Sequence, residues 1–247
     1  MNLRRIAYDT VDSTSERAFA ALAAGTAQHG DLHVARAQTA GHGRFGRPWH
    51  SPAGEGLYAS FVLLPPPPPW NPAAITVAAA LTLYDTATEL GVPDVWLDWP
   101  NDLMSGDAKL AGVLVETRGL DPKKPHYVVG LGLNVRQRSF PPELAAERSV
   151  SSFALLGRDL ELDRVERKLC ECFSRRIEQI DSTPAELEVD FVHATGLANQ
   201  DVLVRVGERE ERGRFAGFSF GAGLLLHLAG GREKRLPVEF VRAVERA

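Results

Sequence analysis

The spacing of apolar residues changes near Gly196, and this change restricts the possible folds more than any other feature of the sequence. Before it, residues 160–180 carry apolar side chains three or four positions apart, which predicts a long amphipathic helix. After it, apolar residues alternate with polar ones, as they do in strands with one buried face. The strands predicted there are 202–206, 212–220, 224–228 and 235–240.

A sheet of so few short strands has too small a core to be stable alone. We therefore expect a curled sheet or small barrel that packs against a larger first unit. With the boundary at residue 196, the two units are 1–195 and 196–247. A chain of 247 residues is long enough for one large and one small unit.

The first unit is predicted to mix helices and strands, which gives the α+β class. A capping segment at 12–16 precedes strong helix formers that end at Gly25, so a short helix is expected between them. The five prolines of 65–69 should form a stiff extended spacer. Further helices are predicted at 72–90 and 183–193, and strands at 32–37, 57–64, 95–97, 111–116 and 127–133.

The composition is that of an ordinary globular protein, with 44% hydrophobic and 24% charged residues. A formal net charge of -4 does not indicate nucleic acid or an anionic membrane as a partner. The sequence has no apolar run long enough for a transmembrane helix and no apolar signal core, so we expect a cytoplasmic protein. Cys170 and Cys172 diverge on the predicted helix, which indicates reduced thiols.

The loop over residues 38–52 contains the pattern Gly41-x-Gly43-x-x-Gly46. A dinucleotide-binding fingerprint needs a helix directly after the glycines, and the prolines and glycine that follow prevent one. Without a helix, such a loop can wrap a small anion with backbone N–H groups and with the guanidinium groups of Arg44 and Arg47. The alternative is a solvated basic loop.

Two further segments carry polar residues next to predicted strands. In the first, Asn101 and Asp102 precede Lys109, where the Asp could hold magnesium and the Lys could contact an acyl or phosphoryl oxygen. The alternative is a surface ion pair worth less than about 1 kcal/mol. In the second, the strand GLGLNV (130–135) ends with a carboxamide at Asn134.

Together these segments resemble the biotin protein ligases. The resemblance rests on GHGRFGRPWHSPAGEGLY (41–58), WPNDLMSGDAKLAGVLVE (99–116) and GLGLNV (130–135), with the leading residues 13–15. It implies a mixed-sheet catalytic domain of the biotin/lipoate ligase type, followed by a small SH3-like β-barrel domain. It also implies a short form of the family without an N-terminal DNA-binding domain, so no repressor function is expected.

The family reaction joins biotin to ATP as biotinyl-5′-AMP and transfers biotin to a lysine of a biotin carboxyl carrier protein. By resemblance, Lys109, Arg44 and Arg47 are catalytic, and Asp102 and Asn134 bind Mg²⁺. The residues implied for biotin are Ser13, Thr14, Gln38, Gly41, His42, Arg44, Lys109, Gly112 and Gly132. Those implied for ATP are Arg44, Arg47, Trp49, Asn101, Lys109 and Asn134. Alternatively, Ser13 and Thr14 serve only as helix caps and Trp49 only as core packing.

The sequence departs from the family pattern at three positions. Asp98 stands where the family usually has Lys, which reverses the charge beside the proposed phosphate site. His42 replaces an Arg of the loop, and Ser15 replaces an Asn. A histidine is mostly neutral at pH 7, so we expect the loop to carry less positive charge than is typical.

Two other functions remain open at this point. A lipoate or octanoate ligase or transferase of the same superfamily would need a long apolar slot instead of a polar pocket. A non-catalytic biotin-binding homologue would have lost activity through Asp98 and His42. The expected partners are biotin, ATP and the carrier domain of a carboxylase, with no nucleic acid and no membrane. A homodimer is compatible with the family.

Overall fold

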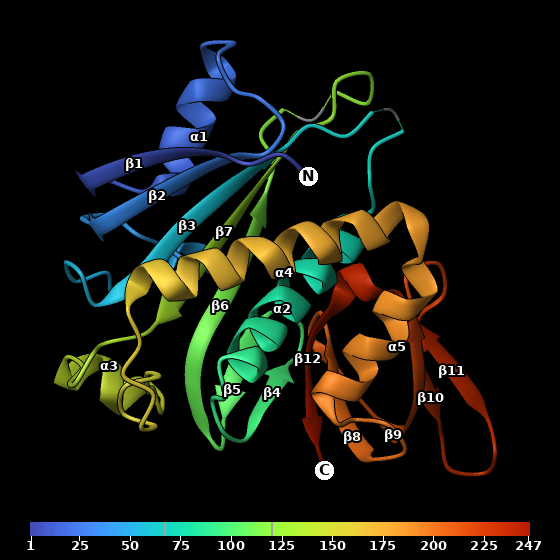
Figure 1. Cartoon of the computed structure of the whole chain (residues 1–247). Coiled ribbons are helices and arrows are strands. Elements are labelled where there is room, and N and C mark those ends of the chain that lie inside the picture. Colours follow the sequence, from blue (N-terminus) through green and yellow to red (C-terminus); the bar gives the residue numbers. More distant parts are fainter. Residues whose placement is uncertain (67, 120) are drawn as a thin grey trace.

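The computed structural model describes residues 1–66, 68–119 and 121–247 and contains two sheets (Figure 1). In the larger, seven-stranded sheet, only β1 and β2 pair in parallel and all other neighbours are antiparallel, so the sheet is mixed. Its strands, in spatial order, are β1 (Arg4–Val11), β2 (Asp31–Gln38), β3 (Gly56–Leu63), β7 (Tyr127–Asn134), β6 (Ala108–Glu116), β5 (Asp102–Ser105) and β4 (Val95–Asp98).

Helices cover both faces of the larger sheet. On one face, α1 (Thr14–Ala23) packs through Phe19 against Val62 and Val128. On the other face lie α2 (Pro72–Glu89), α4 (Leu162–Ser182) and α5 (Pro184–Thr195), and the main core is formed between them and the sheet. There Phe61 of β3 stacks on Phe173 of α4 with ring centroids 3.7 Å apart. Every residue of β3 is buried because helices cover the sheet on both sides.

The face toward α1 is hollow at the centre of the sheet. Gly112 on β6 pairs with Gly132 on β7, and Gly130 on β7 pairs with Ser60 on β3. Since residues two apart on a strand point to the same face, these positions present three glycines and one small hydroxyl side chain. The missing side chains leave room between the sheet and the loop at 39–52.

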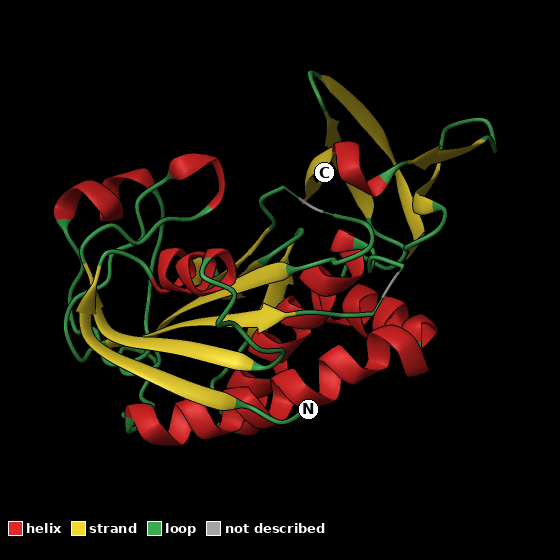
Figure 2. Cartoon of the chain, turned by 90° about the horizontal axis from the view of Figure 1, so that it is seen from above, coloured by secondary structure: helices red, strands yellow, loops and turns green. Residues whose placement is uncertain are grey.

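The second sheet has five antiparallel strands and stands beside one end of the first (Figure 2). Aromatic packing joins the two units: Phe218 lies 5.3 Å from Trp99 and 5.7 Å from Phe191, measured between ring centroids. The strands, in spatial order, are β11 (Glu233–Leu236), β10 (Gly223–His227), β9 (Arg209–Ser219), β8 (Asp201–Val206) and β12 (Val241–Arg246).

The structure corrects the sequence-based interpretation of this second unit. The predicted strand 235–240 is two elements, because β11 ends at Leu236 and a 3₁₀ turn occupies Val238–Phe240. Pro237 explains the break, since proline has no backbone N–H to donate to a neighbouring strand. The chain then forms β12, a fifth strand that pairs with β8.

In the larger unit the sequence analysis missed β1, β5 and the short helix α3 (Pro142–Glu147). The edge strand β1 is partly exposed, contains charged residues and pairs only with β2, so no apolar pattern marks it.

The expected cap at the start of α1 was wrong in detail, because the Ser13 side chain makes no capping hydrogen bond. Residue 67 of the predicted proline spacer lies outside the described residues. No described helix combines the length and apolar character needed to cross a membrane.

Candidate functional site

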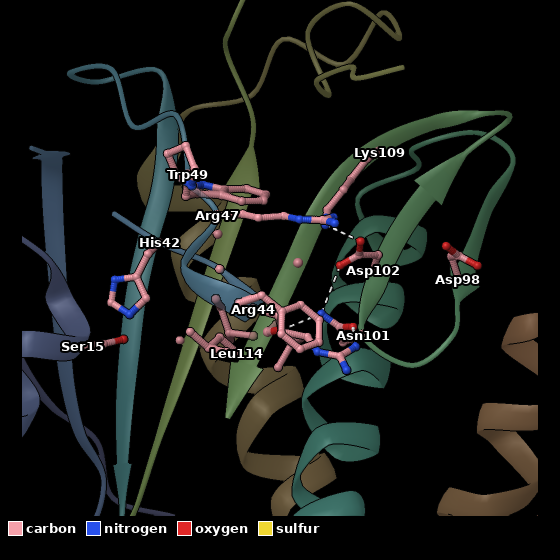
Figure 3. Close-up of a pocket in the computed structure, with 18 of the residues that line it drawn as sticks. Ser15, His42, Arg44, Arg47, Trp49, Asp98, Asn101, Asp102, Lys109 and Leu114 are labelled. Atoms are coloured by element: carbon pink, nitrogen blue, oxygen red, sulfur yellow. Dashed lines mark hydrogen bonds and ion pairs between the residues drawn. The ribbon is translucent and has the colours of Figure 1, made fainter. Parts of the chain in front are cut away.

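A cavity of about 500 Å³ lies between the glycine-containing face of the larger sheet, the loop at 38–49 and the β4–β5 hairpin (Figure 3). Two arginines of the second sheet, Arg205 and Arg242, also line it. The cavity brings together most residues predicted from sequence: Ser13, Thr14, Gln38, His42, Arg44, Arg47, Trp49, Asn101, Asp102, Lys109, Gly112 and Gly132.

One end of the cavity is lined by buried hydroxyl and amide groups. The Thr14 hydroxyl lies 2.7 Å from the Ser60 hydroxyl and donates to Gln38 Oε1 at 3.1 Å. The Thr14 backbone N–H also donates to Gln38 Oε1, at 2.8 Å. The Ser15 hydroxyl lies 3.0 Å from that of Ser60. These groups provide both donors and acceptors to a buried neutral polar ligand, which must be fully hydrogen-bonded to bind well.

The other end is dominated by an ion pair between Lys109 and Asp102. Lys109 is only 9% exposed, which overturns the alternative of a pair on the protein surface. Lys109 lies on β6 opposite Met104 of β5, and Asp102 lies two residues before Met104 on the same strand. An amine held in this way can move from Asp102 to an incoming anion without crossing solvent.

Asn101 connects the glycine-rich loop to this ion pair. Its Nδ2 group donates to Asp102 Oδ1 at 3.1 Å and to the Val113 carbonyl at 2.8 Å. Its Oδ1 atom accepts from Arg44 Nη1 at 3.0 Å. Asn101 therefore holds Arg44 toward the same part of the cavity as Asp102, and Figure 3 shows these side chains in one chain of contacts.

Trp49 covers the cationic end. The amine of Lys109 lies 5.5 Å from the centroid of the Trp49 ring, within the range of a cation–π contact. The indole lies close against strand β7 because Gly132 beneath it has no side chain. Arg47 is exposed and extends from the loop toward Lys109 in Figure 3.

Burial and charge shift two pKa values in the cavity. Burial lowers the pKa of Lys109, and the attraction of Asp102 opposes that effect. Burial, reinforced by the negative charge of Asp102, raises the pKa of Asp98 to about 6. Asp98 pairs with Asp102 across β4 and β5 and lines the same cavity, so the charge reversal at this position does face the site.

The other two departures from the family pattern also lie at the cavity. Ser15 belongs to the hydroxyl cluster around Ser60. His42 Nε2 lies 3.6 Å from Glu116 Oε2 at the end of β6. His42 thus lies near an acidic residue without a hydrogen bond between the two side chains.

Two predicted site residues do not line this cavity. Gly41 is buried in the loop, where its carbonyl accepts from the Trp49 backbone N–H at 2.8 Å. Asn134 donates to the Ser151 carbonyl at 3.0 Å and accepts from Gln137 at 3.3 Å. Asn134 lines instead a small pocket of about 20 Å³, together with Leu144, and this pocket shares Trp49, Lys109 and Arg148 with the cavity.

The chemistry of the cavity fits a magnesium ion only as a companion of a bound phosphate. Among the described residues no group of three or more His, Cys, Asp or Glu side chains converges. Mg²⁺ is commonly bound by one or two carboxylates, with phosphate oxygens and water completing its coordination. Asp102 can supply one such carboxylate, whereas the Asn134 amide is already engaged.

Sequence reasoning missed Ser60 and Arg148. Ser60 stands at the centre of the hydroxyl cluster and is fully buried. Its signal was available, because it is the one hydroxyl side chain besides Tyr58 in the apolar segment 57–64. Arg148 follows α3, which the sequence pattern did not reveal, and no motif marked it.

Comparison with known proteins finds similarity to biotin and lipoate ligases. A sequence model of the biotin/lipoate A/B protein ligase family matches residues 7–134. The biotin–[acetyl-CoA-carboxylase] ligase of Paracoccus denitrificans is 30% identical over 205 residues, which are 81% of this chain and 85% of that protein. The bifunctional ligase/repressor BirA of Bacillus subtilis is 32% identical over 178 residues, which are 71% of this chain. The chain spans about half of that relative, since the match covers 54% of it.

A solved structure extends the similarity to the whole chain. The biotin protein ligase from Aquifex aeolicus in complex with biotin and ATP superposes with a TM-score of 0.77 and is 26% identical. The superposition covers 99% of each chain, so it includes both sheets. The arrangement of a seven-stranded mixed sheet and a separate five-stranded sheet is therefore shared with that protein.

Proposed function

The chain belongs to the biotin/lipoate A/B protein ligase family, and we propose that it is a biotin protein ligase. In the proposed reaction ATP activates biotin to biotinyl-5′-AMP, and biotin then passes to a lysine of a biotin carboxyl carrier domain. The observation that carries the proposal is a single cavity with a hydroxyl- and amide-lined end and a cationic end. The Aquifex aeolicus neighbour, solved with biotin and ATP, supports the same two ligands here.

The polar end favours biotin over lipoate or octanoate. The ureido ring of biotin has two N–H donors and one carbonyl acceptor, which suit Gln38 and the hydroxyls of Ser13 and Thr14. An octanoyl or lipoyl chain has no polar group at its far end and would leave buried hydroxyls without a ligand partner. Gly112 and Gly132 have no side chains, so Lys109, Asp102 and Trp49 can lie close to the sheet at the cationic end.

The first step joins a carboxylate to a phosphate, so two anions must meet. One carboxylate oxygen of biotin forms a bond to the α-phosphorus of ATP, and the bond from that phosphorus to the bridging oxygen breaks, which releases pyrophosphate. We assign Lys109 to both reacting groups and Arg44 and Arg47 to the phosphate oxygens. Cations already in place stabilise the negative charge that builds up in the transition state.

The nucleotide also needs a metal and a surface for its base. Asp102 would hold Mg²⁺, which neutralises phosphate charge when bound. Asn101 keeps Asp102 and Arg44 oriented toward the phosphates through the hydrogen bonds described above. Trp49 offers an indole face on which a purine can stack.

In the second step the ε-amino nitrogen of the acceptor lysine, after losing its proton to solvent, attacks the acyl carbon of biotinyl-5′-AMP. The bond between that carbon and the phosphate oxygen breaks, AMP leaves, and the nitrogen gives a second proton to solvent as it becomes the amide nitrogen. Lys109 and the loop arginines hold the departing AMP phosphate. Adenylation is needed because a free carboxylate is a poor acyl donor.

Exchange of labelled pyrophosphate into ATP tests the first step. With Mg²⁺ and biotin we expect exchange, and we expect none with lipoate or octanoate in place of biotin. Exchange only with lipoate or octanoate would move the protein to that branch of the family. Calorimetric binding of biotin without exchange would instead indicate a non-catalytic biotin-binding protein, and either result would contradict the proposal.

Substitution of Gly132 tests the place of Trp49. In Gly132→Ala the new Cβ atom would lie 2.5 Å from Cε2 and 2.6 Å from Nε1 of Trp49, so the indole must shift. We expect the KM for ATP to rise about tenfold and the free energy of unfolding to fall by about 1–3 kcal/mol from overpacking. The control is Gly221→Ala, whose Cβ would meet no atom within 4 Å. An unchanged KM for ATP would rule out a role of Trp49 in nucleotide binding.

A further inference from the structure

The buried hydrogen bonds at the polar end of the cavity run in one direction. A backbone N–H can only donate, so the Gln38 atom that lies 2.8 Å from the Thr14 nitrogen is the amide oxygen. On the other side, Gln38 Nε2 donates to the Ser51 hydroxyl at 3.0 Å, and that hydroxyl donates to the Trp49 carbonyl at 3.0 Å. Two backbone groups, one at each end, therefore fix the orientation of the Gln38 amide.

This orientation determines where the hydroxyl protons lie. An amide oxygen can only accept, so the proton of the Thr14 hydroxyl points to Gln38 Oε1, at 3.1 Å. The contact of 2.7 Å between the Thr14 and Ser60 oxygens then needs the proton of Ser60. The contact of 3.0 Å between the Ser60 and Ser15 oxygens in turn needs the proton of Ser15. Because a hydroxyl has one proton and two lone pairs, these three hydroxyls have only lone pairs left for a ligand.

Ser60 is the residue on which this arrangement depends. It is fully buried and lies on β3 in register with Gly130 of β7. A Cβ atom at Gly130 would lie 3.0 Å from Ser15 Oγ, so the glycine leaves the space in which Ser15 reaches Ser60. Ser60 accepts the proton of Ser15 and donates its own to Thr14. Without Ser60, the Ser15 hydroxyl would be free to rotate and to donate to a ligand.

We propose that Ser60 determines specificity, because by engaging the Ser15 proton it makes the hydroxyl groups of this end accept hydrogen bonds only. These groups then select a ligand that presents N–H groups. The inference rests on the proposed function, whose ligand biotin carries two N–H groups on its ureido ring. Ser60 acts through Ser15 and Thr14, so it is a positioning residue and not a catalytic one.

The selection follows from what an oxygen atom would meet in place of an N–H group. A ring oxygen at that position would face the hydroxyl lone pairs with its own lone pairs, and no proton would lie between them. Burying unpaired polar groups in this way is costly. A site that hydrogen-bonds an N–H group of its ligand therefore discriminates strongly against an analogue of the same shape that lacks it.

Calorimetric binding of biotin and of its two cyclic carbamate analogues tests the proposal. In each analogue an oxygen atom replaces one of the two ureido N–H groups. The wild-type chain should bind biotin about 100-fold more tightly than at least one analogue. In Ser60→Ala this preference should fall to about tenfold or less, and the affinity for that analogue should rise, because the Ser15 hydroxyl can now donate to the ring oxygen. A general structural defect would lower both affinities instead.

Two further variants sharpen the test. The rise in affinity for the analogue should be lost in the double variant Ser15→Ala/Ser60→Ala, which has no free hydroxyl proton at this point. Ser105→Ala is the matched control, because Ser105 is also a buried serine and its hydroxyl donates to the Pro93 carbonyl at 2.8 Å, outside the cavity. Its preference for biotin should stay within about twofold of the wild-type value.

Several results would overturn the role of Ser60. One is the same preference in Ser60→Ala and Ser105→Ala, and another is similar affinity of the wild-type chain for biotin and both analogues, which needs no variant. Binding requires neither ATP nor turnover, so the proposed function is tested separately by pyrophosphate exchange. If the wild-type chain selects biotin through Ser60 but shows no exchange, the proposed function fails and the inference stands. Exchange with biotin without discrimination against the analogues would leave the function and overturn the inference.

Discussion

Lys109→Gln is expected to lower the rate of biotin-dependent pyrophosphate exchange about 10²- to 10³-fold. Lys109 is buried, paired with Asp102 and directed into the cavity where carboxylate and phosphate would meet. Glutamine retains a hydrogen-bond donor but removes the positive charge that stabilises the transition state. Removal of one preorganised stabilising donor from an active site commonly costs this much in kcat. The measurement is the initial rate of exchange at saturating biotin and ATP.

The loss should be catalytic and not a consequence of unfolding. The Asp102 side chain is 24% exposed, so water can solvate it once Lys109 is gone. We therefore expect a destabilisation of about 1 kcal/mol, which corresponds to about 2–4 °C in Tm for a chain of this size. Lys123→Gln, an exposed lysine away from the cavity, is the control. Exchange by Lys109→Gln within threefold of the wild-type rate would remove Lys109 from the mechanism.

Asp98→Asn is expected to stabilise the protein, and by an amount that depends on pH. In the folded chain the pKa of Asp98 is raised from 3.8 to about 6, first by burial and then by the charge of Asp102. A raised pKa means that ionised Asp98 costs stability, because each unit corresponds to about 1.36 kcal/mol. Above pH 7 the substitution should therefore raise the free energy of unfolding by up to about 3 kcal/mol.

The gain should disappear as the pH falls. Below about pH 3, Asp98 is protonated in the folded chain and the unfolded chain alike, so a neutral Asn brings no advantage. The gain should be small at pH 4, grow as the pH rises to about 6, and become constant above about pH 7. Denaturant unfolding at pH 4, 6 and 8 measures it, and Asp107→Asn, which changes an exposed carboxylate in the turn between β5 and β6, is the control. A gain of the same size at pH 4 and pH 8 would refute this account of Asp98.

Most elements of the fold could be predicted from the sequence because they bury apolar residues at a regular spacing. Helix α4 was predicted within two residues at each end, and β3 within one residue. The missed strand β1 is ordered by backbone pairing with β2, to which charged side chains contribute no pattern. The missed strand β12 follows the break at Pro237 and pairs with β8, whereas β11 before the break pairs with β10.

The candidate site could be predicted only where its residues form motifs. The loop arginines, Asn101, Asp102 and Lys109 lie within short segments whose residue types indicate anion binding, and the cavity brings them together. Ser60 and Arg148 lie in segments without such a motif and enter the cavity through strand register and backbone pairing. No spacing in the sequence encodes either placement.

The sequence by itself determined the α+β class, the change to short strands after Gly196 and the residue types available for binding an anion. Only the tertiary structure decided which charges act on one another. Asp98 faces Asp102 because the β4–β5 register sets them opposite each other, and Lys109 is buried because loop and sheet close around it. Burial and distance fix the strength of an electrostatic interaction, and both arise only when distant segments pack together.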